Sequence, residues 1–139
     1  MPAHAITKRF TFYGALPPGS DKSHLAIVLN EKENFVKYCY CTSVFNLSLL
    51  RYSQCDCFVI KADDMADYFP GSSKETYVYF SEDKIITITL GVLQIKLRNG
   101  EYEERKPLDE IIFSDLVEAI KLSDNLSERF KGELLDFIQ

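Results

Sequence analysis

His24 is the side chain in this sequence best suited to acid–base chemistry, because an imidazole exchanges its proton near neutral pH. The 139-residue chain has one other histidine, His4, which lies in the terminal segment, where chains are usually poorly ordered. His24 directly follows the Pro- and Gly-containing loop 16–23 and opens a short apolar stretch. We therefore expect its ring at the mouth of a sheet or barrel. There it would be either an acid–base group or a structural histidine bonded to a nearby carbonyl.

Four cysteines form two Cys-x-Cys pairs, Cys39 with Cys41 and Cys55 with Cys57. Residues i and i+2 share one face of a strand, so two adjacent strands could gather four thiolates around zinc. Structural zinc sites more often use Cys-x-x-Cys, and cysteine is among the most buried residue types. We interpret the four as reduced thiols that fill the core, which predicts no metal and no cofactor. Zinc binding and redox chemistry are the alternatives.

Two hydroxyl side chains end the strand that carries the first cysteine pair. Thr42 and Ser43 follow Cys41 directly. At the end of a buried strand they could line the same mouth as His24, where they would bind a phosphate or orient an attacking 2′-hydroxyl. The alternative is an ordinary strand end whose hydroxyls cap the following turn.

The other polar and aromatic side chains carry weaker signals. Asp63, Asp64 and Asp67 are close enough in sequence to share a divalent cation, but they lack the Asp-x-Asp-x-Asp-Gly loop of a calcium site. We interpret them as solvated surface. Of the eight tyrosines, some could stack single-stranded bases, while most would pack the core.

Strands are the elements that must position these groups, because β-branched, aromatic and alternating apolar residues dominate the first two-thirds of the chain. Within residues 35–43, strict alternation puts Cys39 and Cys41 on one face and Tyr38 and Tyr40 on the other. We expect strands at residues 8–13, 24–30, 35–43, 55–60, 76–80 and 84–97, the last with a bend or bulge at Gly91.

The apolar period changes from strand-like to helical after Pro107. Residues 112–120 and 126–138 then predict two helices, the second capped by Ser123 or Asp124. Strands first and helices last predict an α+β domain, built on a curled antiparallel sheet or small barrel and closed by C-terminal helices. We expect one domain over residues 1–139, with the barrel at about 7–97 and the helices at about 107–138.

Composition and charge exclude several classes of protein. Hydrophobic residues make up 46% of the chain, which argues against disorder. No apolar run is long enough to span a bilayer, and the first residues have no apolar signal core, so we expect a cytoplasmic protein without membrane contact. The net charge of −5 comes entirely from residues 73–139, because residues 1–72 carry equal numbers of acidic and basic side chains. This argues against a large nucleic-acid surface, though not against a small basic cleft.

The order of the motifs resembles that of the MazF/PemK-type toxins, the endoribonucleases of type II toxin–antitoxin pairs. The loop and strand Pro18–Asn30 are similar to their Gly-Ser loop and the apolar strand that follows a basic residue. Residues Tyr38–Ser43 resemble their second signature, an apolar strand that ends in Thr-Thr or Thr-Ser. Residues Glu75–Phe80 are similar to the Ser-Tyr-Val strand of one PemK-like branch.

This resemblance implies an SH3-like β-barrel that forms a homodimer and is neutralised by a protein antitoxin. It implies metal-independent cleavage of single-stranded RNA by attack of the 2′-hydroxyl on the neighbouring phosphate. Carried onto this sequence, the catalytic residues are His24, Thr42 and Ser43. Lys22 and Thr76 are the expected substrate contacts.

The match departs from the better-known members at the start of the strand. Those members have Arg followed by Pro, whereas this chain has His24 followed by Leu25, as in a His-Leu branch. An arginine would stabilise the extra negative charge on a pentavalent phosphorane. His24 could do the same as an imidazolium, or serve instead as a general acid or base.

A second hypothesis of a different class is a catalytically inactive SH3-like barrel that binds a protein or peptide. The missing arginine and the acidic second half of the chain favour it. Cleavage of RNA, or growth arrest that depends on His24 or Thr42, would separate the enzyme from the binding module.

Overall fold

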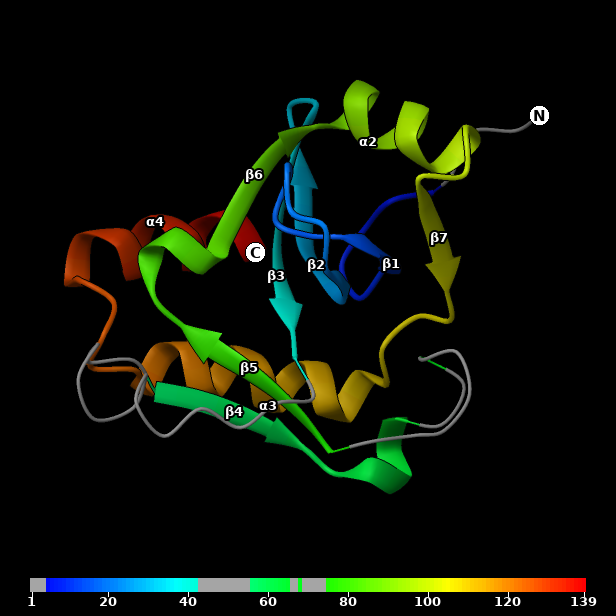
Figure 1. The fold of residues 1–139 in the computed structure, drawn as a ribbon. Coiled ribbons are helices and arrows are strands. Elements are labelled where there is room, and N and C mark those ends of the chain that lie inside the picture. Colours follow the sequence, from blue (N-terminus) through cyan, green and yellow to red (C-terminus); the bar gives the residue numbers. More distant parts are fainter. Residues whose placement is uncertain (1–4, 43–55, 66–67, 69–74) are drawn as a thin grey trace.

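Five antiparallel strands form the main sheet of the computed structural model, which describes residues 5–42, 56–65, 68 and 75–139 (Figure 1). In spatial order they are β6 (Ile85–Thr89), β3 (Phe35–Cys41), β2 (Ser23–Lys32), β1 (Thr11–Ala15) and β7 (Tyr102–Arg105). A two-stranded sheet pairs β4 (Asp56–Ile60) with β5 (Thr76–Phe80). The helices are α2 (Leu90–Arg98), α3 (Glu110–Leu122) and α4 (Glu128–Ile138), and two 3-10 turns are η1 (Ala62–Met65) and η2 (Glu82–Lys84). The fold is therefore α+β.

Strand β2 separates two hydrophobic cores, and its sequence explains why. Its residues 25–29 are all apolar and fully buried, so both faces of the strand need cover. Leu25, Ile27 and Leu29 pack into what we call the first core, together with side chains of α3 and α4. Ala26 and Val28 pack into what we call the second core, with side chains of β1, β7 and α2. The strand expected at residues 24–30 is present as part of β2.

Strand β3 alternates as its sequence predicts. Cys39 and Cys41 are buried in the first core, whereas Tyr38 is buried in the second, where its ring meets Phe12 edge-on at a centroid distance of 5.2 Å. The register pairs Cys41 with Leu25 across from β2. The period of two therefore decides which side chains reach each core.

The expectation of strand across residues 84–97 is wrong beyond Thr89. The β-branched run ends there, and Leu90, Leu93 and Leu97 then recur at helical spacing. The side chain of Thr89 accepts a hydrogen bond from the backbone N–H of Val92 at 3.4 Å, which caps α2. Leu93 and Leu97 are buried in the second core, so tertiary packing stabilises a helix where local propensity suggested a strand.

Strand β7 (Tyr102–Arg105) is not among the strands expected from the sequence. A turn at residues 99–100 comes before it, with Gly100 at a φ of +84°. The chain then runs along β1, and Thr11 pairs with Arg105. This pairing joins residues more than 90 positions apart, so no local sequence pattern predicts it.

The two predicted C-terminal helices are present, but their caps differ from expectation. The Asp109 carboxylate accepts hydrogen bonds from Ile111 N (2.9 Å) and Ile112 N (3.2 Å) at the start of α3. Ser127, and not Ser123 or Asp124, caps α4 by accepting from the N–H of its third residue at 3.1 Å. Ser123 instead ends α3. In the part of the chain that the structure describes, no helix is long and apolar enough to cross a membrane.

Thr42 and Tyr77 tie the two sheets together. The N–H of Thr42 donates to the carbonyl of Tyr77 at 2.9 Å, and the N–H of Tyr77 donates to the carbonyl of Thr42 at 2.8 Å. The end of β3 is thereby joined to β5 near the start of β2. This corner of the fold carries the candidate site.

Candidate functional site

His24 is the second residue of β2, and strand pairing determines its surroundings. It lies opposite Gly14 of β1 in the sheet register. On the other side the pairing of Leu25 with Cys41 makes Thr42 the next residue across from His24. The His24 side chain is partly buried, because it lies where the buried part of the strand begins. The register therefore places Thr42 across from His24 at this end of the sheet.

One hydrogen bond orients the His24 ring. Its Nδ1 lies 3.0 Å from the carbonyl oxygen of Cys41. A carbonyl oxygen only accepts, so Nδ1 carries the proton of this bond. In neutral His24 the other nitrogen, Nε2, then keeps its lone pair and can accept a proton. The structural alternative considered above, a histidine bonded to a carbonyl, is thus present and at the same time prepares Nε2 for acid–base chemistry.

The surroundings of His24 favour its neutral form. Burial is the largest influence and lowers the pKa below the ordinary value of 6.5, while the bond to Cys41 opposes it. The positive charges of Lys22 and Lys84 lower the pKa further. Near pH 7 the ring is therefore mainly uncharged. This favours the general acid–base role over the alternative in which His24 acts as a fixed imidazolium.

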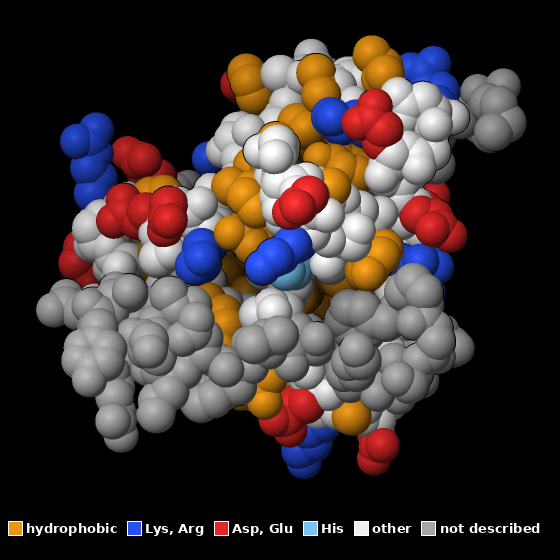
Figure 2. Space-filling view, in the orientation of Figure 1, with side chains coloured by type: hydrophobic (Ala, Val, Ile, Leu, Met, Phe, Trp, Pro, Cys, Tyr) orange, Lys and Arg blue, Asp and Glu red, His pale blue; other side chains and the backbone are white. Residues whose placement is uncertain are grey.

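Lys84 and Tyr40 complete the group around His24. The rings of His24 and Tyr40 lie 5.6 Å apart between centroids, tilted by 46°. The Lys84 Nζ lies 5.9 Å from the centre of the Tyr40 ring. Figure 2 shows the histidine, in pale blue, near the middle of one face, with blue Lys or Arg side chains directly beside it and orange apolar side chains around them.

Sequence reasoning did not single out Lys84, and it named Tyr40 only as one of several tyrosines that could stack bases. Lys84 is 60 positions from His24 in the chain. It reaches the site because Ile85 pairs with Cys39, which puts Lys84 beside Tyr40 at the same end of the sheet. The only local signal was a basic residue at the start of a β-branched strand, a feature common to many surface positions.

The remaining predicted site residues are less closely grouped. Lys22 is exposed in the loop two positions before His24, and its backbone N–H donates to the Ser20 hydroxyl at 3.1 Å. Thr76 pairs with Ile60, and its side chain is fully buried, so it does not share the exposed face of His24. Its role as a substrate contact stays a prediction. Ser43 lies outside the described residues.

The cysteines behave as core side chains in the described part of the chain. Burial raises the pKa of Cys39 to about 12, and that of Cys41 also lies well above its ordinary value. The Cys39 thiol donates a weak bond to the Ile27 carbonyl at 3.8 Å. Cys57 is only partly buried on β4, and Cys55 lies outside the described residues. Within the described ranges no cluster of three His, Cys, Asp or Glu side chains has the arrangement of a metal site.

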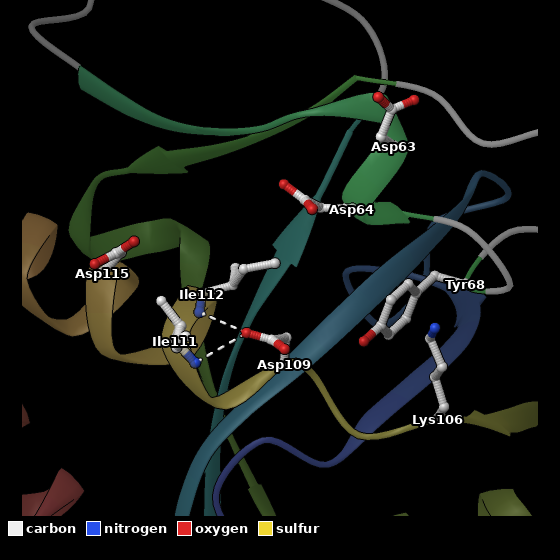
Figure 3. Close-up of a pocket in the computed structure, with 8 residues that line it drawn as sticks. All are labelled: Asp63, Asp64, Tyr68, Lys106, Asp109, Ile111, Ile112 and Asp115. Carbon is white, nitrogen blue, oxygen red and sulfur yellow. Dashed lines mark hydrogen bonds between the residues drawn. The ribbon is translucent and has the colours of Figure 1, made fainter.

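A pocket lies between η1 and the start of α3, and two of the aspartates noted in the sequence line it. Asp63 and Asp64 border a pocket of about 510 Å³ that Lys106, Asp109 and Asp115 also line (Figure 3). Asp109 is already engaged as the cap of α3, as the dashed lines of Figure 3 mark. Asp67 lies outside the described residues.

No protein-family model, curated protein or solved structure matches this chain. The resemblance to the MazF/PemK-type toxins therefore rests on the motifs of the sequence. Any function must be argued from the chemistry of the site itself.

Proposed function

We propose that this chain is a metal-independent endoribonuclease that cleaves single-stranded RNA by 2′-hydroxyl attack. The observation that carries the proposal is the His24 ring, held through Nδ1, mainly uncharged near pH 7, and flanked by Lys22 and Lys84. A neutral, oriented imidazole beside positive charge is the arrangement that base-catalysed cleavage of a phosphodiester requires.

In this mechanism Nε2 of His24 takes the proton of the 2′-hydroxyl. The 2′-oxygen then forms a bond to the adjacent phosphorus, and the bond from phosphorus to the 5′-oxygen breaks. The leaving 5′-oxygen takes a proton from water, and His24 later releases its proton to solvent, so the products are a 2′,3′-cyclic phosphate and a 5′-hydroxyl. Thr42, next across from His24 in the register, would hold the phosphate, with Ser43 beside it in sequence.

The fold is compatible with the SH3-like barrel that the resemblance implies. The sheet order β6-β3-β2-β1-β7 keeps the proposed catalytic strand β2 at its centre, and the Thr42–Tyr77 bridge joins it to the hairpin β4–β5. Two helices close the chain, as in the toxins that the motifs resemble. We extend the proposal to their other properties: a homodimer that acts in the cytoplasm and is neutralised by a protein antitoxin.

The test is cleavage of an unstructured RNA by the purified, antitoxin-free protein in the presence of EDTA. We expect fragments that end in a 2′,3′-cyclic phosphate, identified by mass spectrometry. His24→Gln keeps the size of the side chain and removes the base, so it should abolish cleavage. Lys37→Ala is the matched control, because Lys37 lies on the face of β3 opposite to Tyr40. Its Nζ donates a hydrogen bond to the Thr87 hydroxyl.

An intact substrate after long incubation with the wild-type protein would overturn the proposal, as would equal cleavage by His24→Gln. The second candidate, a non-enzymatic barrel that binds a protein or peptide, predicts the intact substrate. Expression in a bacterial host gives an independent readout, since growth arrest that depends on His24 supports the enzyme.

A further inference from the structure

We propose that Lys84 binds the scissile phosphate of the RNA and, together with Lys22, forms a two-lysine anion site around His24. This inference rests on the proposed function and assigns the residue that compensates for the missing arginine. Its ligand class is the phosphodiester of a single-stranded RNA, or a phosphate ion in its place.

The position of Lys84 is determined by the fold. It is the last residue of η2, and its backbone N–H donates to the Ser81 carbonyl at 3.0 Å. The next residue, Ile85, is buried in the first core and pairs with Cys39. The Lys84 side chain is thereby held beside Tyr40, on the side of the sheet where His24 also meets that ring.

The charges of Lys22 and Lys84 are not neutralised by any described residue. In the part of the chain that the structure describes, five other cations have a carboxylate within 4 Å: Lys96, Arg105, Lys121, Arg129 and Lys131. In the described ranges neither Lys22 nor Lys84 has such a partner.

The acidic neighbours of Lys84 are directed elsewhere. Glu82 accepts a hydrogen bond from Ser127 N at 3.5 Å, and Asp83 accepts one from the Ser81 hydroxyl. The positive charges of Lys22 and Lys84 both lower the pKa of His24, so both act on the same ring, in a chain that is acidic as a whole. This local excess of positive charge in an acidic protein points to an anionic ligand.

Lys84 and His24 would then divide the work that one arginine does in the better-known toxins. Among the described residues, the groups that face His24 are Gly14 of β1, Lys22 of the loop, Tyr40 of β3, Thr42 directly after β3 and Lys84 of η2, and none of these is acidic. The uncharged imidazole takes the proton. The lysine ammonium, a compact point charge, stabilises the additional negative charge of the phosphorane.

Two measurements test this division of roles between His24 and Lys84. Both use four proteins: wild type, Lys84→Ala, Lys84→Arg and the control Lys37→Ala. The first is an NMR titration of the His24 imidazole with and without inorganic phosphate. We expect phosphate to shift the His24 and Tyr40 resonances, and we expect Lys84→Ala to weaken that shift and raise the His24 pKa. Lys37→Ala should do neither.

The second measurement is single-turnover cleavage of RNA. We expect Lys84→Ala to lower the rate of the chemical step by on the order of 100-fold, with a smaller change in substrate affinity. Lys84→Arg should restore much of the rate, because it keeps the charge. Circular dichroism checks that each variant is folded.

The outcomes separate this inference from the proposed function. If wild type and Lys84→Ala cleave equally while His24→Gln is inactive, the function stands and the role of Lys84 is overturned. If no RNA is cleaved but phosphate binds in a Lys84-dependent manner, the anion site stands and the function fails. If phosphate leaves the His24 and Tyr40 resonances unchanged, or Lys84→Ala leaves the His24 pKa unchanged, the anion site is overturned.

Discussion

The Nδ1 of His24 lies 3.0 Å from the carbonyl oxygen of Cys41, the residue paired with its own neighbour Leu25. A carbonyl from the adjacent strand thus sets the tautomer of the only histidine among the described residues. Nε2 is left to exchange a proton, and burial and two lysines hold the pKa below 6.5.

The rate of RNA cleavage should therefore fall as pH decreases through the lowered His24 pKa and be level above 6.5. The reason is that the general base works only when uncharged. A pH–rate profile of kcat/KM measures this. A rate that rises on acidification would instead indicate that imidazolium is the active form, and would contradict the assignment.

The lowered His24 pKa also affects how the stability of the protein depends on pH. A pKa that is lower in the folded than in the unfolded state means that unfolding takes up a proton. The free energy of unfolding should thus decrease as pH falls from 6.5 through the folded pKa, and His24→Gln should lose this part of the pH dependence. Urea denaturation at several pH values measures this free energy for wild type and His24→Gln. The same dependence of the free energy of unfolding on pH in both proteins would contradict the prediction.

Gly14 should not tolerate a side chain. A Cβ there would lie 2.4 Å from Cδ1 of Tyr102 and 2.9 Å from the carbonyl oxygen of Glu101. We expect Gly14→Ala to cost about 1–3 kcal/mol of unfolding free energy and to disturb the partner His24. Gly132→Ala in α4 is the control, since a Cβ there meets nothing within 4 Å and should add up to about 1 kcal/mol. Chemical denaturation measures the unfolding free energy of both variants. Equal changes for Gly14→Ala and Gly132→Ala would contradict the close approach of β1 and β7.

The cap of α4 offers a comparison between sequence and structure. Ser127→Ala should destabilise the protein by about 1 kcal/mol, because the N–H of Phe130 loses its acceptor. Asp124→Ala, at a position that sequence reasoning considered as the cap, should change stability little. Thermal denaturation of both variants distinguishes the two assignments, and a larger effect at Asp124 would favour the sequence-based one.

The buried thiols should resist alkylation in the native state. The thiolate is the reactive form, and burial holds the pKa of Cys39 at about 12. Iodoacetamide at about pH 8 should therefore modify the partly exposed Cys57 well before Cys39 or Cys41. Mass spectrometry of digests taken at intervals measures the order. Rapid modification of Cys39, or about one zinc per chain by elemental analysis, would contradict the core role.

Local patterns predicted much of this fold. The buried strand from Leu25 to Leu29 follows from a short, wholly apolar run. The alternation of Cys39 and Tyr38 follows from a period of two, and helices α3 and α4 follow from a period of 3.6. Residues 90–97 of α2 were misread as strand, because a short apolar run after β-branched residues fits either element. Only burial of Leu93 and Leu97 in the second core selects the helix.

The candidate site, too, could be predicted from the sequence only in part. His24, Thr42 and Lys22 could be named from the sequence, because a titratable or polar group beside a buried strand is a local feature. That Lys84 joins them depends on the pairing of β6 with β3, and that Nδ1 of His24 carries the proton depends on a carbonyl of the adjacent strand. The sequence by itself thus determined the types of chemical group present. The tertiary structure decided their grouping, tautomer and charge state, because these depend on contacts between residues far apart in the chain.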